Sequence, residues 1–543
     1  MNARSRVSLL YPAQSSPRPS RAEALHSGDL GLVSITRALD FDQRHTRIII
    51  ATLTALETDP TIIQYRQDVL RDLVANPDLA ARLIALLPTL TALAEAGPSA
   101  RWNERAALPF VGARLADLDS YVTCVEQLWH ALVECKHPLQ AQAWRDLQAM
   151  VASMRADDDY TRLRVELPLL QAQLAQAGSV TLGINLDGQL QPESATLLAI
   201  SPNRYAGKGG VIERLLGEHR ATDSIRGVTA LYKASEGQQR SPEHELFRDL
   251  GRLVERVAAP VGAALERYVR VNAAPLTTLA GELAFYLGAL RLWRQLEAAG
   301  LPVCLPEITP ANERAGELRA TYSIDLALRK TGNSEIIPND SFFTPETPIM
   351  LVMGPNSGGK TTYARAIAQA QVMFQAGLFV AAEYARLSPV EAVLSHFATV
   401  ERPGGSGGRL AEELERVAQL FKYSTATCLL IFNEPFSSTD PHSARLIARD
   451  VFAGLRFIRA RTIYITHLHD LAADLVPTGD EADGVVCVAA QSVVTEGNDG
   501  TPTYRIERGR PNVSAHALAL AHQFGLDRVQ LEAQLRAQEE KTA

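Results

Sequence analysis

The chain has 543 residues and a formal net charge of −7, and 46% of its residues are hydrophobic. This length predicts several domains, and the negative charge excludes nucleic-acid binding driven by the bulk charge of the chain. No run of about 18 apolar residues predicts a membrane span, because Pro88 interrupts the most apolar helical stretch, Leu83 to Leu93. The five cysteines are scattered without metal-ligand spacing, which indicates core thiols in a reducing compartment.

The first 22 residues are rich in Ser and Arg and contain no acidic residue. Two interpretations are open for this segment, a disordered tail over residues 1–30 and a transit peptide for an organelle. Pro12, Pro17 and Pro19 favour the tail. The chain is then expected to be cytoplasmic.

A long helical region follows the N-terminal segment. Stretches rich in Ala, Leu, Arg, Glu and Gln extend from Ile35 to Ala177 and predict several helices. Proline-containing breaks separate these helices at Pro60, Asn76-Pro77, Gly97-Pro98 and His137-Pro138.

A small β-containing insertion is predicted at about residues 178–235. Residues Ser179 to Gly188 alternate in character, Asp187-Gly188 is a favourable hairpin turn, and Ala195 to Ile200 can supply the returning strand. Helix resumes near Pro242 and continues to Ala299, with a break near Ala274-Pro275.

After Pro302, short apolar runs alternate with turns and helix-like stretches, which is typical of an α/β domain. The boundary is expected between Pro302 and Ser341. We predict a helical region over residues 31–335, an α/β domain over residues 336–520 and a C-terminal helix or tail over residues 521–543.

The α/β region opens with a phosphate-binding motif. Residues 354–361 match the pattern G-x-x-x-x-G-K-[ST], between an apolar strand at Pro348 to Met353 and a helix from Tyr363 to Ala370. Backbone N–H groups of such a loop approach the phosphates of a nucleotide, and the helix N-terminus adds positive potential. The predicted nucleotide-binding residues are Gly354, Pro355, Asn356, Ser357, Gly358, Gly359, Lys360, Thr361 and Thr362.

Four side chains of this region have predicted roles with a nucleotide. Lys360 can reach the β- and γ-phosphates, and the Thr361 hydroxyl suits Mg²⁺. Glu434 follows the strand Thr427 to Phe432, and a carboxylate there can orient the attacking water or accept its proton. His467 ends the next strand and can bind the γ-phosphate. A surface position without function is the alternative for Glu434 and His467, and their order after the loop favours the catalytic interpretation.

The α/β region resembles the MutS family of DNA mismatch-repair ATPases. The residues that carry the resemblance are Ile337-Pro338-Asn339-Asp340, Gly354 to Thr362, Asn433 to Thr439, Ile465-Thr466-His467, and Gly509 to Leu518. Arg66 to Leu70 is similar to a segment of the family's helical core, with less specificity, and Glu243 to Leu296 looks like the family's returning lever helix.

The resemblance implies a multidomain α plus α/β fold. A long-helix core and lever domain, with a clamp-like insertion at about 178–235, would precede an ABC-superfamily P-loop ATPase domain with a C-terminal helical segment. It also implies ATP and Mg²⁺ as cofactors, Glu434, His467 and Lys360 as catalytic residues, and a homodimer formed through the ATPase domains. DNA would be a partner and a membrane would not.

Three departures from the family pattern qualify this resemblance. No mismatch-reading domain precedes the helical core, and the chain ends before any nuclease-like domain, so mismatch reading by this chain is not implied. Asn433 replaces the family's Asp, which holds Mg²⁺ through water, so hydrolysis is expected to be slow. Ser406 is the hydroxyl nearest the place of the Ser that faces the partner's nucleotide, and a flexible loop without such a contact is the alternative.

The evidence for DNA in the residues themselves is local charge. Residues 200–240 hold seven basic and four acidic side chains, a net charge of about +3, and include Arg204 and Lys208 as candidate phosphate contacts. A solvated mixed-charge surface explains the same count. The leading hypothesis is therefore a DNA-associated ATPase of DNA repair or recombination. The alternatives are a nucleotide-gated scaffold with little turnover and another ABC-superfamily ATPase of the chromosome-structure (SMC-like) or transporter type.

Overall fold

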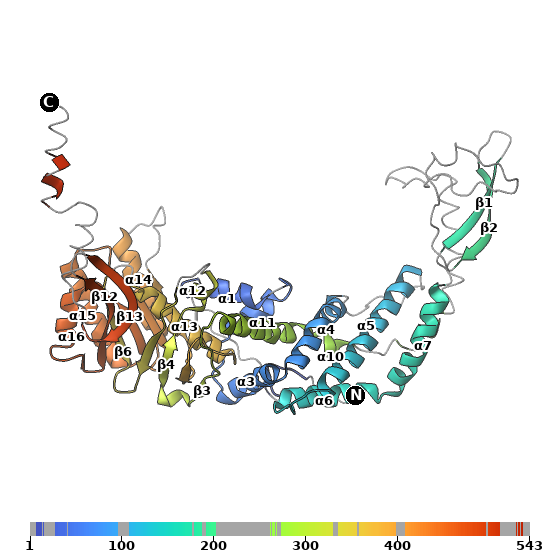
Figure 1. Ribbon diagram of the computed structural model, residues 1–543, viewed down its shortest axis with the longest axis horizontal. Coiled ribbons are helices and arrows are strands. Elements are labelled where there is room, and N and C mark those ends of the chain that lie inside the picture. The colour runs from blue at the N-terminus through green and yellow to red at the C-terminus, as the bar shows by residue number, and fades with distance from the viewer. Residues whose placement is uncertain are drawn as a thin grey trace. The chain divides into compact units, whose positions relative to one another are not determined.

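The structure is a computed structural model, and its described residues form two units by their contacts (Figure 1). The first unit contains residues 1–85, 134–147 and 279–543, and the second contains residues 86–133 and 148–278. The described residues are 7–13, 15, 28–40, 42–95, 108–175, 179–186, 192–201, 261, 263–265, 268, 273–329, 335–355, 358–397, 408–495, 498–510, 528, 530–532, 534 and 535. The helices near the N-terminus therefore belong to the same unit as the α/β region. The predicted boundary near residue 336 had placed these helices in a different domain from the α/β region.

Four helices pack against the α/β part of the first unit. Helix α1 (Leu32–Leu39) contacts α11 (Leu279–Ala298), and α2 (Thr46–Thr54) contacts the helix that follows the phosphate loop. Helix α3 (Pro60–Ala75) begins at Pro60, whose missing N–H costs nothing in a first turn. The Asp59 carboxylate caps that turn by accepting from Thr61 N.

Helix α4 (Pro77–Glu95) runs through Pro88 without interruption, so the predicted break at that proline is wrong. The Ile84 carbonyl loses a hydrogen bond there, but the Ile84 side chain is 44% exposed, so water can reach this face. Burial of Leu83, Leu86, Leu87 and Leu90 along the other face holds the helix together. Among the described residues, α4 alone is long and apolar enough to cross a membrane by length and composition, and 44% of its apolar window is buried inside the protein.

The described residues of the second unit form helices and one hairpin. Its described elements include α5 (Leu108–Val133), α7 (Asp158–Ala175), the short α10 (Ala274–Thr277) and the strands β1 (Ser179–Leu186) and β2 (Pro192–Ser201). Helix α6 (Gln142–Arg155) begins in the first unit and ends in the second. The two strands are antiparallel, which confirms the predicted hairpin strands. The predicted turn at residues 187–188 lies outside the described residues.

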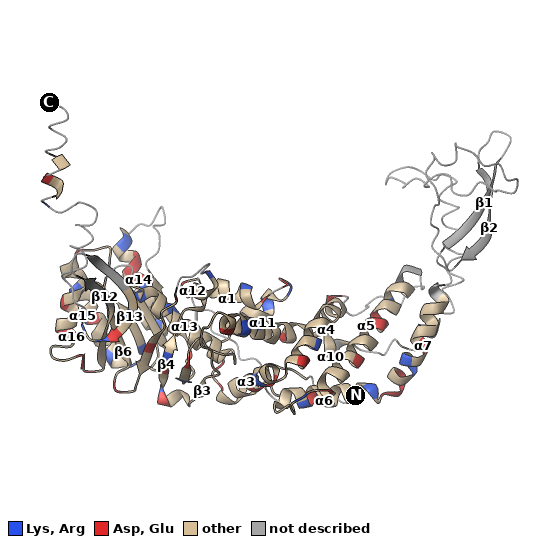
Figure 2. Ribbon diagram, in the orientation of Figure 1, with Lys and Arg blue, Asp and Glu red and all other residues tan. Residues whose placement is uncertain are grey.

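Basic and acidic side chains are interspersed on the described helices of the second unit (Figure 2). Glu126 of α5 illustrates this, because its carboxylate accepts hydrogen bonds from Arg155 at 3.1 Å and from the Tyr160 hydroxyl at 2.8 Å. Such mixed surfaces pair charges within the unit. The basic segment at 200–240, with Arg204 and Lys208, lies outside the described residues except for Ile200 and Ser201.

A seven-stranded sheet forms the centre of the α/β part. Its order is β11-β12-β6-β10-β9-β8, with β13 paired to β12. Strands β12, β6, β10, β9 and β8 are parallel to their neighbours, whereas β11 and β13 pair with β12 in the antiparallel sense. The strands are β6 (Ile349–Met353), β8 (Val393–Phe397), β9 (Leu429–Asn433), β10 (Arg461–Ile465), β11 (Glu481–Ala482), β12 (Val485–Thr495) and β13 (Asn498–Arg508).

A four-stranded mixed sheet and, in the described part of the chain, five α-helices complete this part. The second sheet has the order β3-β7-β4-β5, with β3 (Glu307–Ile308), β4 (Gly316–Thr321), β5 (Asn339–Phe343) and β7 (Tyr384–Leu387). The helices are α12 (Ile324–Arg329), α13 (Lys360–Gln375), α14 (Gly408–Tyr423), α15 (Pro441–Ile458) and α16 (His469–Leu475). Strand and helix alternation from β6 onward confirms the predicted α/β character of this region.

One buried histidine in the parallel sheet predicts a pH-dependent stability. His396 of β8 is 2% exposed, neither ring nitrogen has a hydrogen-bond partner among the described residues, and burial lowers its pKa to about 4. Because the folded state favours the neutral ring, stability is full above the unfolded pKa near 6.5 and is lost as pH falls toward 4. Urea unfolding at pH 7 and pH 5 should show about 2 kcal/mol more loss for the natural protein than for His396→Leu. Equal losses in the two proteins would contradict the assignment.

Candidate nucleotide-binding site

The predicted site residues follow the carboxyl ends of three adjacent parallel strands. Gly354 follows β6, Glu434 follows β9, and His467 follows β10 after Thr466. Strand β10 lies between β6 and β9 in the sheet. Side chains at this edge of a parallel sheet lie close together, and it is where α/β proteins bind ligands.

The phosphate loop begins and ends with a glycine of positive φ, Gly354 and Gly359, and α13 starts directly after Gly359. Gly359 has φ +88° and is the N-cap of α13. Gly354 has φ +127°, and a Cβ there would lie 2.8 Å from the Ala490 Cβ, so this position needs glycine. The loop therefore brings the unpaired N–H groups of the α13 N-terminus to the site, where an anion is favoured.

Lys360 is the first residue of α13, and its ammonium is turned back over the loop. Its Nζ donates to the Gly354 carbonyl at 2.9 Å and to the Pro355 carbonyl at 2.8 Å, and the residue is 5% exposed. Burial lowers the pKa of Lys360, and the nearby Glu434 carboxylate opposes that effect. A buried ammonium held by neutral acceptors gains much from an anionic phosphate oxygen, because water screens it little.

Glu434 and His467 form a direct pair at the ends of neighbouring strands. His467 Nε2 lies 2.6 Å from Glu434 Oε1. This hydrogen bond is the main reason that the pKa of Glu434 is lowered, burial opposes it, and the charges of His467 and Lys360 lower it further. The Glu434 backbone has φ +53°, which is uncommon for a residue with a side chain and typical of functional positions. The carboxylate is therefore ionised and able to accept a proton or a hydrogen bond from water.

Oxygen atoms suited to Mg²⁺ come together beside this pair. The Thr361 hydroxyl donates to the Asn433 side-chain oxygen at 3.1 Å. In the part of the chain that the structure describes, no three His, Cys, Asp or Glu side chains are grouped to hold a metal by themselves. A hydroxyl and an amide oxygen fit Mg²⁺ in the way of sites where phosphate oxygens and water supply the remaining ligands.

Changing Asn433 to Asp tests the metal position. The added negative charge beside Thr361 should tighten Mg²⁺ binding, so the Mg²⁺ concentration for half-maximal ATP turnover should fall about 10-fold in Asn433→Asp. The measurement is ATP turnover against Mg²⁺ concentration, and Asn312→Asp is a control that makes the same chemical change at an exposed residue. An unchanged Mg²⁺ dependence would place the metal elsewhere.

A cavity of about 890 Å³ opens beside the phosphate loop. Its size suits a nucleotide, since small-molecule sites range over about 300–1,000 Å³. The lining residues are Thr321, Tyr322, Ser323, Leu326, Glu335, Ile336, Ile337, Asn339, Gly358, Gly359, Lys360, Thr361, Thr362, Tyr363, Ala366, Glu434, Thr503 and Tyr504. Charged and polar groups of the loop thus share one cavity with the apolar Ile336, Ile337 and Leu326.

Two residues of this cavity had no predicted side-chain role. Tyr504 of β13 lies close to the loop, because a Cβ on Gly359 would be 3.5 Å from its ring. The Asn339 side chain of β5 holds β13 in place through two hydrogen bonds to its backbone. Its Nδ2 donates to the Tyr504 carbonyl at 3.0 Å, and its Oδ1 accepts from Ile506 N at 2.6 Å. Asn339 belongs to a motif noted in the sequence, whereas Tyr504 is 144 residues beyond Lys360 and carries no local signal.

The structure describes most of the predicted site residues. Lys360, Thr361, Thr362, Gly358, Gly359 and Glu434 line the same cavity, and His467 reaches it through Glu434. Asn356, Ser357, the trans-signature candidate Ser406, and the DNA candidates Arg204 and Lys208 lie outside the described residues.

Comparisons with known proteins agree with the geometry. The MutS2 N-terminal domain matches residues 58–299, and MutS domain V matches residues 350–537. A DNA mismatch repair protein MutS of Rhodopirellula baltica is 25% identical over 79% of this chain and 49% of its own length. MutS of Caldanaerobacter subterraneus subsp. tengcongensis is 32% identical over 25% of this chain and 16% of its own length. MutS 1 of Halobacterium salinarum is 29% identical over 32% of this chain and 19% of its own length.

The chain spans half or less of the length of these relatives. The two matching domain models cover both the helical region and the α/β region, in the order that the family resemblance implied. The second of them contains the phosphate loop from Gly354, the Glu434–His467 pair and Tyr504. This chain belongs to the MutS family.

Proposed function

We propose that the chain binds ATP with Mg²⁺ in the cavity beside the phosphate loop and hydrolyses it. The observation that carries this proposal is the meeting of Lys360, Thr361 and the Glu434–His467 pair at one cavity. A phosphate-binding ammonium, an oxygen site for Mg²⁺ and an ionised carboxylate are the parts that phosphoryl transfer to water requires. MutS-family membership supports an ATPase of the ABC-superfamily P-loop type.

Each group of the site has a proposed role. The α13 N-terminus and Lys360 bind the β- and γ-phosphates, and Thr361 with Asn433 would hold Mg²⁺, which neutralises charge that develops on the phosphate oxygens. Glu434 orients the attacking water and takes its proton. His467 holds the Glu434 carboxylate in place through the 2.6 Å contact and binds the γ-phosphate. The Tyr504 ring and Ile337 are the apolar groups proposed to contact the base.

We further propose that ATP changes the conformation of a DNA-associated protein in repair or recombination. The relatives carry the name DNA mismatch repair protein, and family membership supports both DNA association and a homodimer formed through the ATPase domains. In such a dimer Ser406 would face the nucleotide of the partner subunit. Arg204 and Lys208 remain the proposed DNA contacts, and mismatch reading by this chain is not part of the proposal.

ATP turnover with and without DNA tests this function. Plain duplex, mismatched and branched DNA should be compared at two salt concentrations, because phosphate contacts weaken steeply with salt. Stimulation by one DNA form that is lost at high salt supports a DNA-associated ATPase. Glu434→Ala serves as the control that the turnover belongs to this site.

A nucleotide-gated scaffold is the second candidate, and Asn433 is the observation that favours it. A neutral amide beside Thr361 holds Mg²⁺ less strongly than a carboxylate, which favours ATP binding with slow turnover. Tight ATP binding with negligible turnover on every DNA would replace the ATPase proposal by this one.

A further inference from the structure

The segment around Leu9 is packed into the first unit, although its composition predicted a disordered tail. Leu9 is 0% exposed and Leu10 is 4% exposed. A buried segment that bends at residues 9–11 needs partners for its backbone polar groups, because it has no helix or sheet of its own. The hydrogen-bond partners of these backbone groups therefore show whether the protein has a specific binding site for the segment.

Side chains of α3 and α11 bond to backbone groups of residues 8–10, and the Ser8 hydroxyl accepts from Leu10 N at 3.1 Å within the segment. Glu282 of α11 accepts from the Ser8 hydroxyl at 2.8 Å and from Leu9 N at 2.6 Å. The Tyr65 hydroxyl donates to the Ser8 carbonyl at 2.8 Å, and the Tyr286 hydroxyl donates to the Leu9 carbonyl at 3.0 Å. Glu282 is 7% exposed and Tyr286 is 0% exposed. Both side chains are therefore removed from water and bond to the backbone of the segment instead.

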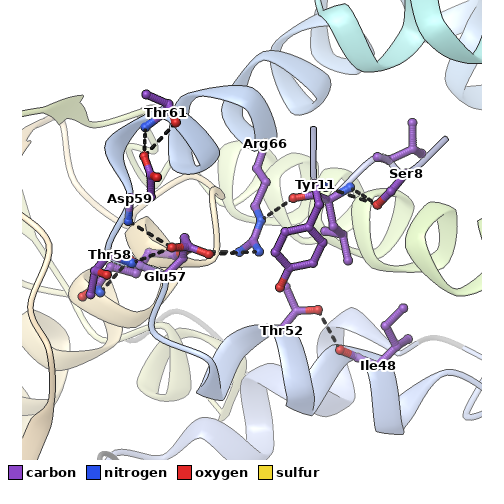
Figure 3. A network of polar contacts seen from close by, with 12 residues as sticks. Ser8, Tyr11, Ile48, Thr52, Glu57, Thr58, Asp59, Thr61 and Arg66 are labelled. Atoms are coloured by element: carbon purple, nitrogen blue, oxygen red, sulfur yellow. Dashed lines mark hydrogen bonds and ion pairs between the residues drawn. The ribbon is translucent and has the colours of Figure 1, made fainter. Parts of the chain in front are cut away.

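Arg66 of α3 extends this site to the next residues of the segment. Its Nε donates to the Leu10 carbonyl at 3.0 Å, and its guanidinium lies 4.7 Å from the centre of the Tyr11 ring. Figure 3 shows the Arg66 guanidinium between the segment on one side and Glu57 on the other, where Nη2 lies 3.9 Å from the Glu57 carboxylate. Arg66 is 0% exposed, so its charge depends on these few contacts.

The same arginine touches the far end of the nucleotide helix. Its Nη1 lies 3.5 Å from the Gln375 carbonyl at the end of α13, and a Cβ on Gly377 would lie 2.1 Å from the Arg66 Cβ. The Gln375 side chain donates to the Glu57 carbonyl at 2.8 Å. Arg66, Glu57 and the C-terminal end of α13 thus form one packed group.

Helix α13 joins this group to the nucleotide site. It has 16 residues from Lys360 to Gln375, a length of about 24 Å, and all but three of them are buried. A buried helix moves as a rigid rod, because packed interiors resist local deformation. A displacement of Gln375 would therefore be transmitted along α13 to Lys360.

We propose that α3 and α11 form a binding site for a short bent peptide segment, that residues 8–11 are its ligand in this chain, and that docking of this strap supports α13. The strap is the sequence Ser8-Leu9-Leu10-Tyr11. The proposed docking rests on the contacts of residues 8–11 with α3 and α11, and it does not require the proposed function. Its coupling to the nucleotide rests on the proposed function, and by linkage ATP then tightens the docking of the strap.

Hydrogen exchange of the full chain measures docking directly. The amides of Leu9 and Leu10 should exchange at least about 100-fold more slowly than in an unfolded chain. Leu9→Asp places a charge in the buried position and should abolish this protection, whereas Ala13→Asp changes an exposed residue of the same segment and should leave it unchanged. Unprotected amides at Leu9 and Leu10 in the natural protein would overturn the proposal.

A synthetic peptide of residues 6–13 tests the site separately. It should bind Leu9→Asp, in which the site is vacated, and should not bind the natural protein, in which the strap competes at high effective concentration. If Leu9→Asp does not fold, Glu282→Gln replaces it and should lower strap protection while keeping the side-chain volume. If the Leu9→Asp protein folds but does not bind the peptide, the proposal of a peptide-binding site is wrong.

Binding of a fluorescent ATP analogue to the same variants tests the coupling. Affinity should fall about 5-fold to 10-fold in Leu9→Asp, stay unchanged in Ala13→Asp, and recover when the peptide is added. Equal affinity in the docked and undocked proteins would overturn the coupling. Absence of ATP binding in the natural protein would instead reject the proposed function, and exchange would still report the docking.

Discussion

Replacing Glu434 by Gln should lower the rate of ATP hydrolysis by about 100-fold to 10,000-fold and leave ATP binding nearly unchanged. Gln keeps the volume of the side chain, and its amide oxygen can still accept from His467. It cannot take a proton from water, and its charge no longer favours the attack. ATP turnover and the dissociation constant of ATP should be measured together on the variant, because only the first should change.

A carboxylate outside the cavity provides the control. Glu383 lies directly before β7 and is exposed, so Glu383→Gln makes the same chemical change without an expected effect on turnover. Equal turnover in Glu434→Gln and the natural protein would mean that another group activates water. Loss of ATP binding in Glu434→Gln would assign this residue to binding rather than to the chemical step.

The pH dependence of turnover gives Glu434 a second test. Its hydrogen bond with His467 is the largest cause of its lowered pKa, so the ionised form should persist to pH values below the ordinary range of Glu, near 4.3. Turnover is lost on the acid side as pH falls through this pKa. His467→Leu removes the hydrogen bond, so this acid limb should move to higher pH.

The local part of the site could be predicted from sequence, because its signals are local. The strand before Gly354, the loop and the start of α13 follow one another along the chain, so one motif with its flanks describes them. Glu434 and His467 were predicted from strand ends, since parallel strands bring their carboxyl ends to the same edge. Their 2.6 Å contact confirms that they are neighbours.

The parts that sequence reasoning missed depend on contacts between distant segments. Tyr504 arrives beside the loop because Asn339 bonds to β13, and no pattern near residue 504 indicates this. The strap at residues 8–11 is four residues long in a segment whose Ser, Arg and Pro content predicted a tail. Ser8 and Leu9 of this segment bond to Glu282, which lies more than 270 residues away in sequence.

The break predicted at Pro88 failed for a related reason. Proline lowers helix propensity by removing one hydrogen bond and crowding the preceding turn. Burial of four leucines on both sides of Pro88 outweighs that cost, since each buried Leu contributes roughly 1.5–3 kcal/mol. Tertiary packing therefore keeps α4 helical through Pro88, although the local sequence predicts a break there.

Changing Lys360 to Met should weaken ATP binding by about 100-fold or more and abolish turnover at ordinary ATP concentrations. Met preserves the apolar length of the side chain and removes the charge that pairs with the phosphates. The ammonium is buried, and burial lowers its pKa, so the folded state carries this charge at a cost that the phosphates of ATP offset. The dissociation constant of ATP in Lys360→Met, measured by calorimetry, checks the expectation.

The stability of the same variant separates a lost binding group from a damaged fold. Without ATP, Lys360→Met should unfold at the same or a higher urea concentration than the natural protein, because a buried charge has been replaced by an apolar group. Lys422→Met on α14 is the matched control, since Lys422 is exposed and the same change there should affect neither binding nor stability. Added ATP should raise the stability of the natural protein and of Lys422→Met but not of Lys360→Met. A Lys360→Met protein that ATP still stabilises would show that the phosphate loop binds the nucleotide through its backbone alone, and Lys360 would then act only in the chemical step.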